Sequence, residues 1–511
     1  MIDTKALREK ILDLAMRGKL VPQDPNDEPA SELLKRIKAE KEELIKQKKI
    51  KRDKNETEIF RGEDGSHYEK NASGEVKPVE VPFEIPDGWE WVNLVEICNY
   101  IQRGKSPKYG LVGIPVISQK SIQWTGFDIS PSKFLDEESF KKYDKIRLLL
   151  PEDILWNSTG TGTIGRVLKL KETDFHLNPI LVADSHVTVV RTFSNINSDF
   201  VNYYLSSKTI QNLIEDMSSG STNQIELSAT QVKSTKIPLP PIKEQEKIVR
   251  AIDELLKIVN TIEQEQKALQ DLSNQLKQKV LTVAMQGKLV PQDPNDEPAS
   301  VLLEKIRAEK QRLFEEGKLK KKDLEEIPVS KEDNAHYGKL PNGWIKVALN
   351  EVGSWKSGTT PRKDKKAYYS NGSIPWLLTG DLNDDYISLI PNKITEVALK
   401  ETSLKINPIG SVLIAMYGAT IGKLGILELP ATTNQACCAC KTFSLIENEY
   451  LFFWLMANRK GFIDKAEGGA QLNISKAKII STFISLPSIY EQQRIIKKIR
   501  SVFLKIAQLK E

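Results

Sequence analysis

The chain has 511 residues, more than a single hydrophobic core usually organises, so its length alone suggests two to four domains. Its composition, 40% hydrophobic and 28% charged with four cysteines, excludes a disulfide framework, and apolar runs such as residues 451–456 are too short to span a membrane. The N-terminus lacks an apolar signal region and the net charge is +5, so we expect a cytoplasmic globular protein whose charge permits a nucleic-acid partner without requiring one.

The first predicted element is an N-terminal helix with Leu7, Ile11 and Leu14 on one face, and it leads into a repeated segment. Residues 15–31, AMRGKLVPQDPNDEPAS, recur at 284–300 with a single difference, Arg17 against Gln286. The helical sequence after each copy, ELLKRIKAEKEEL and VLLEKIRAEKQRL, is similar as well. The chain therefore repeats a helical block almost unchanged.

A first variable module follows, from about residue 55 to 241, and its polar beginning is expected to be exposed. Short strand-like runs near residues 114–122, 153–159, 166–171 and 186–193 are separated by turn residues, and one helix is predicted near 199–217. The string GTGTIG at 160–165 fits a dinucleotide-binding pattern. Because a strand rather than a helix follows it, we interpret it as a strand–turn–strand hairpin.

The central helical block carries apolar residues in alternating steps of four and three, which indicates a long helix with one buried stripe. The stripe runs through Ile248, Ile252, Leu255, Val259, Ile262, Leu269, Leu276, Val280 and Val283. The helix is predicted to end at Gly287, before three prolines, and a second helix to begin near Ala299. The short connection between them predicts antiparallel packing of these two helices.

The second variable module echoes the first. LPNGWIKVAL echoes IPDGWEWVNL, GTTP at Gly358 echoes GKSP at Gly104, and GATIGKL echoes TGTIGRV. Residues 471–496 likewise echo residues 224–249. Three cysteines at 437, 438 and 440 lack the second pair that a zinc site would need, so we interpret their segment as a buried strand. A helix is predicted near 448–467.

A C-terminal helix completes the chain, and its Ile495, Ile499 and Val502 align with the start of the central helix. The N-terminal helix aligns with the end of that central helix. We therefore predict that the two chain ends together rebuild a second copy of the central helix, with pseudo-two-fold symmetry. The alternative is a generic dimerisation coil. That alternative does not explain why the C-terminal helix aligns with the start of the central helix and the N-terminal helix with its end.

The predicted fold class is α+β, with two globular α+β modules joined by long antiparallel coiled-coil helices. The expected boundaries are an N-terminal helical segment at 1–54, a first module at 55–241, a central helical spacer at 242–325, a second module at 326–488 and a C-terminal helix at 489–511.

Loop residues with cationic or hydrogen-bonding ends are the candidates for DNA contact, because lysine and arginine neutralise phosphates and amides or carboxylates read base edges. In the first module these are Lys105, Ser106, Lys108, Gln119, Lys120, Thr161, Thr163, Arg166, Asn223 and Gln224. In the second they are Thr359, Thr360, Arg362, Lys363, Thr379, Asp381, Tyr417, Thr420, Lys423, Gln471 and Asn473. Trp89 and Trp344 open the modules, and we expect both to be buried rather than to stack on a ligand.

The doubled motifs resemble the specificity subunit of type I restriction-modification systems: GW near each module start, GxxP, TIG, and LP-x-I-x-EQ at each module end. AM-x-GKLVPQ after the spacer helix is a further match. The resemblance implies two target recognition domains that each read one half of a split, asymmetric DNA sequence. It implies no catalytic residue, metal or cofactor on this chain.

The same resemblance implies partners. Two methyltransferase subunits would bring S-adenosylmethionine, and two restriction subunits, whose presence stays open, would bring ATP and magnesium; no membrane is involved. Two other interpretations remain open from the residues alone: a two-headed adaptor that binds proteins, and a solitary methyltransferase. Neither module carries a motif for amino-methyl transfer, which disfavours the solitary methyltransferase.

Overall fold

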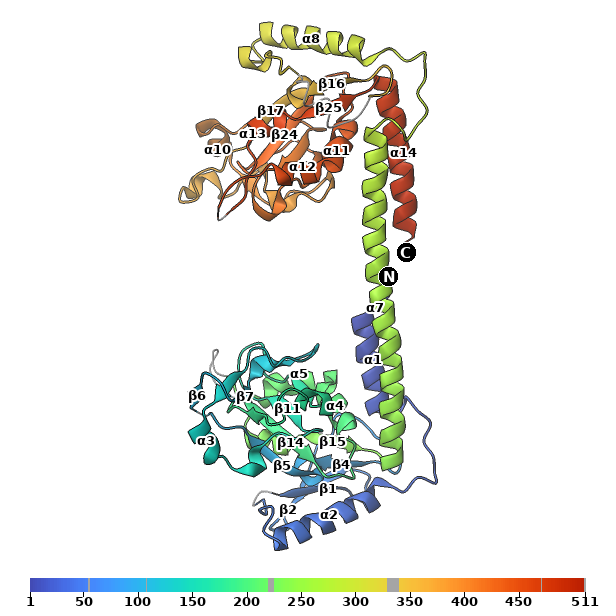
Figure 1. Ribbon diagram of the computed structural model, residues 1–511, viewed down its shortest axis with the longest axis vertical. Coiled ribbons are helices and arrows are strands. Elements are labelled where there is room, and N and C mark those ends of the chain that lie inside the picture. The colour runs from blue at the N-terminus through green and yellow to red at the C-terminus, as the bar shows by residue number, and fades with distance from the viewer. Residues whose placement is uncertain (54–55, 107, 219–224, 329–339, 470, 510–511) are drawn as a thin grey trace. The chain divides into compact units, whose positions relative to one another are not determined.

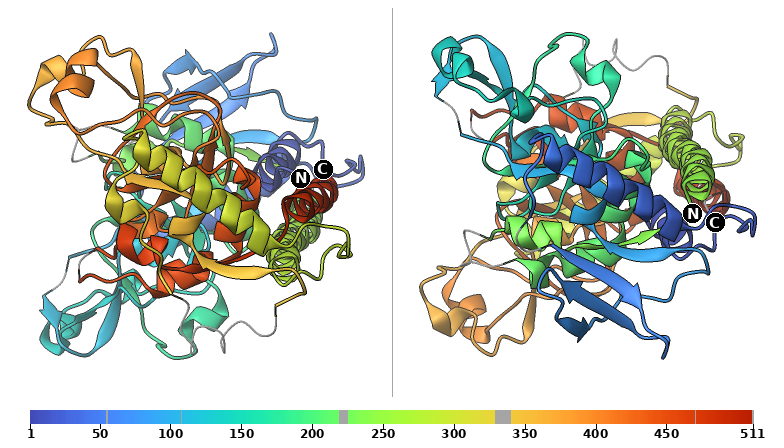
Figure 2. Two further views of the ribbon diagram at one scale, coloured as in Figure 1. Left: turned by 90° about the horizontal axis from the view of Figure 1, so that it is seen from above. Right: turned by 90° about the horizontal axis from the view of Figure 1, so that it is seen from below.

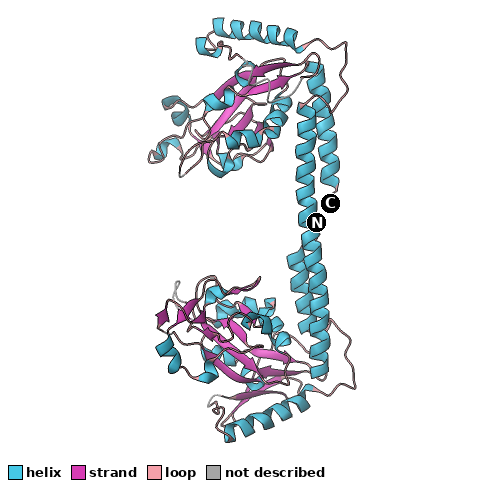
Figure 3. Ribbon diagram, viewed as in Figure 1, coloured by secondary structure: helices cyan, strands magenta, loops and turns pink. Residues whose placement is uncertain are grey.

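The structure is a computed structural model that describes residues 1–511 except 54–55, 107, 219–224, 329–339, 470 and 510–511. The chain packs as two compact units, Ile2–Glu265 and Gln266–Glu511. The long helix α7 (Ile242–Met285) contributes its first part to one unit and its last part to the other. Figures 1 and 3 show that each unit combines helices with a mixed-sheet module, so the predicted α+β class is confirmed.

The unit formed by residues 2–265 holds the first module. Its helices are α1 (Thr4–Met16), α2 (Ala30–Lys46), α3 (Glu137–Lys141), α4 (Ser198–Ser206), α5 (Lys208–Met217), α6 (Ala229–Lys233) and the first part of α7. Its strands are β1 (Thr57–Arg61), β2 (His67–Asn71), β3 (Val76–Pro78), β4 (Glu90–Asn93), β5 (Cys98–Arg103), β6 (Tyr109–Gly110), β7 (Ile114–Ile117), β8 (Ile122–Gln123), β9 (Gly126–Phe127), β10 (Lys133–Leu135), β11 (Ile154–Asn157), β12 (Val167–Lys169), β13 (Val182–Ala183), β14 (Val187–Thr192) and β15 (Lys236–Leu239).

Two four-stranded sheets form the body of this module, in the orders β12-β11-β14-β5 and β13-β7-β10-β6. The first is antiparallel throughout, with Leu155 opposite Val189 and Val190 opposite Ile101. The β-branched run of β14 favours a strand, and its first four residues are buried. In the second sheet β13 pairs with β7 in parallel.

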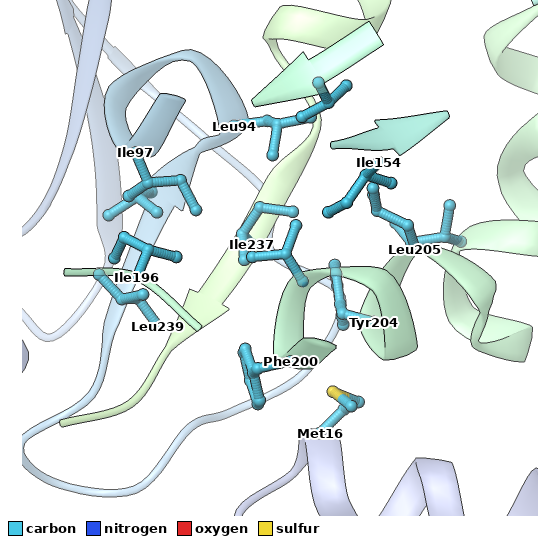
Figure 4. Close-up of a cluster of buried hydrophobic side chains, with 14 of the residues drawn as sticks. Met16, Leu94, Ile97, Ile154, Ile196, Phe200, Tyr204, Leu205, Ile237 and Leu239 are labelled. Atoms are coloured by element: carbon cyan, nitrogen blue, oxygen red, sulfur yellow. The ribbon is translucent and has the colours of Figure 1, made fainter. Parts of the chain in front are cut away.

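The core of this unit lies between the first sheet, the β4–β15 pair and helix α4 (Figure 4). Ile154 of β11, Ile237 of β15 and Tyr204 of α4 point into one cluster and are almost fully buried. Met16, at the end of α1, packs against the same cluster, so the module and its scaffold helix share a core. Burial of each aliphatic side chain in this cluster, such as Ile154, Ile237 and Met16, stabilises the unit by roughly 1.5–3 kcal/mol.

The unit formed by residues 266–511 holds the second module. Its helices are the last part of α7, α8 (Ala299–Glu315), α10 (Glu396–Glu401), α11 (Asn448–Ala457), α12 (Arg459–Asp464), α13 (Lys476–Ile480) and α14 (Ile489–Gln508). Its strands are β16 (Ile345–Ala348), β17 (Gly353–Ser357), β18 (Ile374–Leu377), β19 (Asp385–Ile387), β20 (Lys393–Ile394), β21 (Val412–Ala415), β22 (Leu424–Leu427), β23 (Thr432–Thr433), β24 (Cys437–Thr442) and β25 (Phe483–Leu486).

The second module repeats the topology of the first. Its main sheet has the order β17-β24-β21-β22-β19, and a smaller sheet has the order β20-β18-β23. β24 is the predicted cysteine strand, and Cys437, Cys438 and Cys440 are buried free thiols within it. The modules differ at one edge: β19 extends the main sheet beside β22 in parallel, whereas the first module has a separate β8–β9 hairpin.

We call α1, α7 and α14 the scaffold. α1 runs antiparallel to the first part of α7, because Arg8 reaches Asn260 and Glu263 while Gln23, beyond the end of α1, reaches Glu244. In the other unit Lys277 of α7 lies over the ring of Phe503 of α14, and Ser488 at the start of α14 bonds Asp296 beyond the end of α7. Each terminal helix is thus an antiparallel partner of one part of α7.

Each module is fastened to the scaffold by the same three side chains, which we call the clasp: Trp89, Glu244 and Gln245 in one unit, and Trp344, Glu491 and Gln492 in the other. Each tryptophan Nε1 donates to the glutamate Oε2 at 2.9 Å. Each glutamine Oε1 accepts a backbone N–H from the residue before the module's helix, Asn197 or Glu447, at 3.0 Å. The GW and EQ motifs are therefore two halves of one buried contact, and both tryptophans are buried as predicted.

The repeated 17-residue segment surrounds each clasp, which explains why its two copies are nearly identical. Asp27 pairs with Lys247 at 2.9 Å, and Asp296 pairs with Arg494 at 2.6 Å. Gly18 has φ +66°, and a Cβ there would lie 2.3 Å from Pro86 Cγ. Because the second copy has the same conformation and close approach, both copies need the same residues.

We expect Glu491→Gln to become more stable relative to the wild type as the pH rises from about 4 to about 7. Burial raises the pKa of Glu491 above its usual value of 4.5, against the opposing hydrogen bond from Trp344. The folded unit therefore holds this proton more tightly than the unfolded chain does. The stability that this group contributes is complete below pH 4.5 and is lost as the pH rises through the folded pKa. Glutamine keeps the acceptor for Trp344 without the charge, and unfolding midpoints across this pH range measure the difference.

Asp296→Asn is the matched control with the opposite sign. The hydrogen bond from Arg494 lowers the pKa of Asp296, so its carboxylate contributes stability above pH 3.8 that is lost as the pH falls through the folded pKa. This variant should be the less stable one near neutral pH, and its deficit should shrink in acid. Parallel pH profiles for both variants would contradict the interpretation of the clasp.

Three expectations from the sequence are corrected. α8 does not pack along α7: it crosses the end of the second module (Figure 2), where Glu309 accepts the backbone N–H of Ser444 at 3.0 Å. The polar beginning of the first module, expected only to be exposed, also forms the β1-β2-β3 sheet, which the sequence did not predict. Leu276 in the predicted stripe is 43% exposed, because α14 and the second module cover the face with Leu281 and Ala284 instead.

Candidate nucleic-acid interface

The loops that carry the predicted DNA-contacting residues converge on one edge of the first module. β5 and β11 run antiparallel to β14, so the ends of β5 and β11 meet the start of β14 at this edge. The N–H of Asp184 donates to Ile117 O at 3.0 Å, which links the ends of β7 and β13. The N–H of Val187 donates to Asp184 O at 3.2 Å, which brings both ends to the start of β14. We call this the reading edge of the first module.

Backbone hydrogen bonds hold the reading edge together. The N–H of Gly104 donates to Val187 O at 2.9 Å, and that of Lys105 donates to Ala183 O at 3.1 Å. A Cβ at Gly104 would lie 2.2 Å from Ala183 O, so only glycine allows the two chain segments to approach so closely. The loop that begins with Lys105 is thus fixed at its base.

Side chains along the edge are linked to one another. Gln119 Oε1 lies 3.3 Å from Thr163 Oγ1 and 3.5 Å from Thr159 Oγ1. Thr159 also bonds His186 Nδ1 at 2.7 Å, and Ser106 bonds the hydroxyl of Ser185 at 2.6 Å. Gln119, Thr159, Thr163 and His186 thus form one hydrogen-bonded group, and the Ser106–Ser185 pair lies next to it in the chain at His186. Hydroxyl, amide and imidazole groups of this kind can hydrogen-bond to base edges.

The structure brings most of the predicted residues of the first module to this edge. Gln119, Thr163 and Arg166 are half-buried, and Lys105, Ser106, Lys108, Lys120 and Thr161 are exposed. Asn223 and Gln224 lie outside the described residues. Arg166 is held in place: Nη1 donates to Gln123 Oε1 at 2.6 Å and Nη2 to Gly162 O at 2.9 Å.

Sequence reasoning missed Trp124 and His186 at this edge. Trp124 is 56% exposed in the turn between β8 and β9, directly after Gln123. The Thr-Gly turn that follows Trp124 is a local signal that this side chain is exposed. A tryptophan in such a turn is notable because tryptophan is ordinarily buried. His186 is exposed beside Asp184, whose pKa is raised by burial and lowered in part by the backbone N–H of His186.

The second module has a reading edge with the same backbone frame. Gly358 N–H donates to Cys437 O at 3.1 Å, Thr359 N–H to Thr433 O at 2.9 Å, and Asn434 N–H to Leu377 O at 3.0 Å. Thr359 bonds the hydroxyl of Ser403 at 2.8 Å, and Thr360 donates to Gln435. Ser403 and Gln435 are a further two edge residues that the sequence did not single out.

The other predicted residues of the second module divide into two groups. Arg362, Lys363, Lys423, Gln471 and Asn473 are exposed, while Thr379, Asp381, Tyr417 and Thr420 are half-buried like Thr359 and Thr360. The carboxylate of Asp381 accepts the N–H of Leu378 at 2.8 Å, and the hydroxyl of Thr420 donates to Tyr417 O at 2.8 Å. These two side chains therefore have a structural use within the edge.

The chain is similar to known proteins over most of its length. The family model described as the type I restriction modification DNA specificity domain matches residues 86–270 and 341–511. The chain belongs to this family. It is 30% identical to the type I restriction enzyme EcoAI specificity subunit of Escherichia coli, with 99% of this chain and 90% of that protein covered. The EcoEI specificity subunit of Escherichia coli is 28% identical over the same shares of the two chains.

A solved structure also resembles this chain. It comes from work on complex assembly and conformational transition of the type I R-M system, covers 84% of this chain and 93% of its own, and has a TM-score of 0.59 at 19% identity. That likeness shows the fold. The specificity subunit is the DNA-recognition component of its complex and is not an enzyme; it binds DNA and assembles with other subunits. Within the described ranges, no helix has the length and apolar character needed to cross a bilayer.

Proposed function

We propose that each module reads one half of a split, asymmetric DNA sequence through its reading edge. The observation that carries this proposal is that both edges share one hydrogen-bonded frame but present unlike side chains. The frame places Gln119 where the other module has Thr379, and Ser185 where the other has Gln435. Because different donor and acceptor patterns select different base pairs, two such edges select unlike half-sites.

The candidate residues keep distinct roles in this proposal. Exposed lysines such as Lys105, Lys120 and Lys363 contact phosphates, which sets orientation without sequence preference. Gln119, Arg166 and Gln471 contact base edges in this proposal, because amide and guanidinium groups form paired hydrogen bonds in the major groove. The two modules correspond to the predicted ranges 55–241 and 326–488, which remain part of the proposal.

The scaffold fixes the distance between the half-sites. α7 has 44 residues, which corresponds to about 66 Å of helix. α1 and α14 each pack on one part of it, as expected if the chain ends together rebuild a second central helix. The scaffold also docks two methyltransferase subunits, which bring S-adenosylmethionine, and it accepts two restriction subunits with ATP and magnesium where the system includes them.

Insertion of one heptad into α7 at Glu265 is expected to lengthen the unread spacer of the DNA target by about three base pairs. Seven residues add about 10 Å of helix, and each base pair spans about 3.4 Å. Selection from a random duplex library, with the methyltransferase subunits present, gives the preferred spacer. The control is seven glycine and serine residues inserted at Gly317, after the end of α8, which should leave the spacer as it is. An unchanged spacer in the α7 variant would refute the role of the scaffold.

A further inference from the structure

A basic pocket of about 220 Å³ adjoins the reading edge of the second module. Three lysines and five small polar or glycine residues line it: Lys356, Ser357, Gly358, Ser403, Lys405, Asn407, Thr433 and Lys476. We call it the lysine pocket. Gly358 leads directly into Thr359 and Thr360 of the reading edge, so the lysine pocket and the proposed base-reading loop are parts of one surface.

Four separate segments build the lysine pocket. Lys356 and Ser357 end β17, and Ser403 and Lys405 come from the segment between α10 and β21. Thr433 ends β23, and Lys476 begins α13. Their convergence requires the tertiary fold, so neither the spacing of the lysines nor a single charged run in the sequence reveals the site.

Hydrogen bonds hold the walls of the lysine pocket in place. The buried Asn407 donates through Nδ2 to Ala431 O at 3.2 Å. Lys476 Nζ donates to Trp355 O at 3.3 Å, which directs this half-buried ammonium group towards β17. The hydroxyl of Ser403 bonds Thr359 at 2.8 Å and so ties the wall to the reading edge. The site is therefore formed before any ligand arrives.

The charge of the lysine pocket is not balanced by the protein. No aspartate or glutamate is among its lining residues, and none of Lys356, Lys405 and Lys476 forms an ion pair with another described residue. Some lysines elsewhere in the module do have partners, such as Lys365 with Glu401 and Lys478 with Glu467. Three ammonium groups around one cavity repel one another unless an anion lies between them.

We propose that the lysine pocket holds a phosphate group of the DNA backbone beside the half-site that the second module reads. This inference rests on the proposed function and adds one contact that fixes where the duplex lies on the module. A phosphate bound in the lysine pocket positions the duplex against Thr359 and Thr360. Lysine and serine side chains bind phosphate by charge and by hydrogen bonding, and such contacts set orientation while base contacts set sequence.

The first module has a different arrangement at the corresponding place. The shared backbone frame puts Gln102 and Arg103 where the second module has Lys356 and Ser357. Arg103 is ion-paired with Glu226 at 2.8 Å, and Arg147 donates to Arg103 O at 3.0 Å. Arg103, unlike Lys356, thus has its charge balanced by a carboxylate, so we assign the seated phosphate to the second module.

The test uses the full complex with its methyltransferase subunits and the double variant Lys356→Met, Lys405→Met. Both side chains are exposed, so the fold does not depend on them. Because this variant no longer neutralises the seated phosphate, the slope of log affinity against log salt concentration should become shallower by about 0.9. Affinity at low salt should fall about tenfold for target and random duplexes alike, while the selected bases stay the same.

Two controls separate the lysine pocket from general charge. Lys356→Arg with Lys405→Arg keeps both cations and should keep the wild-type slope. Lys305→Met removes an exposed lysine of α8, which packs at the opposite end of the second module, and should also keep the slope. An unchanged slope in the double methionine variant, in a complex that still selects its sequence, would overturn the lysine pocket while leaving the proposed function intact. A wild-type complex that selects no sequence would instead refute the proposed function.

A final arm distinguishes a DNA phosphate from a free phosphate ion. Inorganic phosphate is titrated at constant ionic strength, and thermal stability is compared between the wild type and the double methionine variant without DNA. Selective stabilisation of the wild type, together with an unchanged salt slope for DNA, would show that the pocket takes a free ion and would overturn the proposal. A changed salt slope without such selective stabilisation supports it.

Discussion

Lys310→Met is expected to destabilise the second unit by about 3–5 kcal/mol, because it leaves a buried carboxylate without its cation. Lys310 Nζ lies 2.9 Å from Glu351 Oε1, and both side chains are at most 5% exposed. The second oxygen of Glu351 is buried without a hydrogen-bond partner among the described residues, so Lys310 carries most of the compensation for that charge. Removal of one partner from such a pair costs far more than the pair itself contributes.

Hydrogen exchange read out by mass spectrometry suits this test, because a chain of two units does not unfold in a single two-state step. Protection should fall in α8 and the second module but not in residues 2–265. The double variant Lys310→Met, Glu351→Leu should recover most of the stability, since no buried charge remains. Lys41→Met is the matched comparison: Lys41 pairs with Glu56, whose side chain is 27% exposed, so we expect a smaller effect. Equal destabilisation of the two units would contradict this account.

Gly358→Ala is expected to abolish recognition of one half-site, with a fall in affinity for the full target of at least about 100-fold. A Cβ at this position would lie 2.1 Å from Thr433 O and 2.2 Å from Asn434 O, and both are backbone atoms that cannot rotate away. The loop that begins at Thr359 must therefore move off the edge. Sequence selection should then lose all preference in the half-site of the second module and keep it in the other.

Gly380→Ala is the control, since Gly380 lies at the same reading edge and a Cβ there meets no atom within 4 Å. It should preserve both half-sites. Gly104→Ala should give the converse of Gly358→Ala, because its Cβ would lie 2.2 Å from Ala183 O in the first module. Loss of both half-sites from either single substitution would mean that the modules do not read independently.

The helices were largely predictable, because their signals are local. The prolines and Gly287 mark the end of α7, and the predicted start of α8 at Ala299 is confirmed. The hairpin around residues 160–165 also followed from local chemistry, since β11 and β12 flank it as an antiparallel pair. Because the chain contains two similar modules, an element predicted in one module could be checked against the matching sequence of the other.

What could not be predicted depends on contacts between distant segments. The clasp joins Trp89 to Glu244, 155 positions apart, and neither residue alone signals the other. The packing of α8 on the module rather than on α7 follows from Lys310 and Glu351, whose pairing appears only in three dimensions. The lysine pocket could not be predicted because its cations come from separate segments of the chain.

The clasp makes the two modules interchangeable parts. Each module contributes one tryptophan near its start and one backbone N–H. The scaffold helix at each clasp supplies a glutamate that accepts from the tryptophan and a glutamine that accepts from the backbone N–H. Nothing in this joint depends on which bases the attached module reads. A genetic exchange that cuts the coding sequence between the joints would therefore deliver a protein with a new target in one event, already correctly seated, whereas point mutation would have to rebuild a reading edge residue by residue.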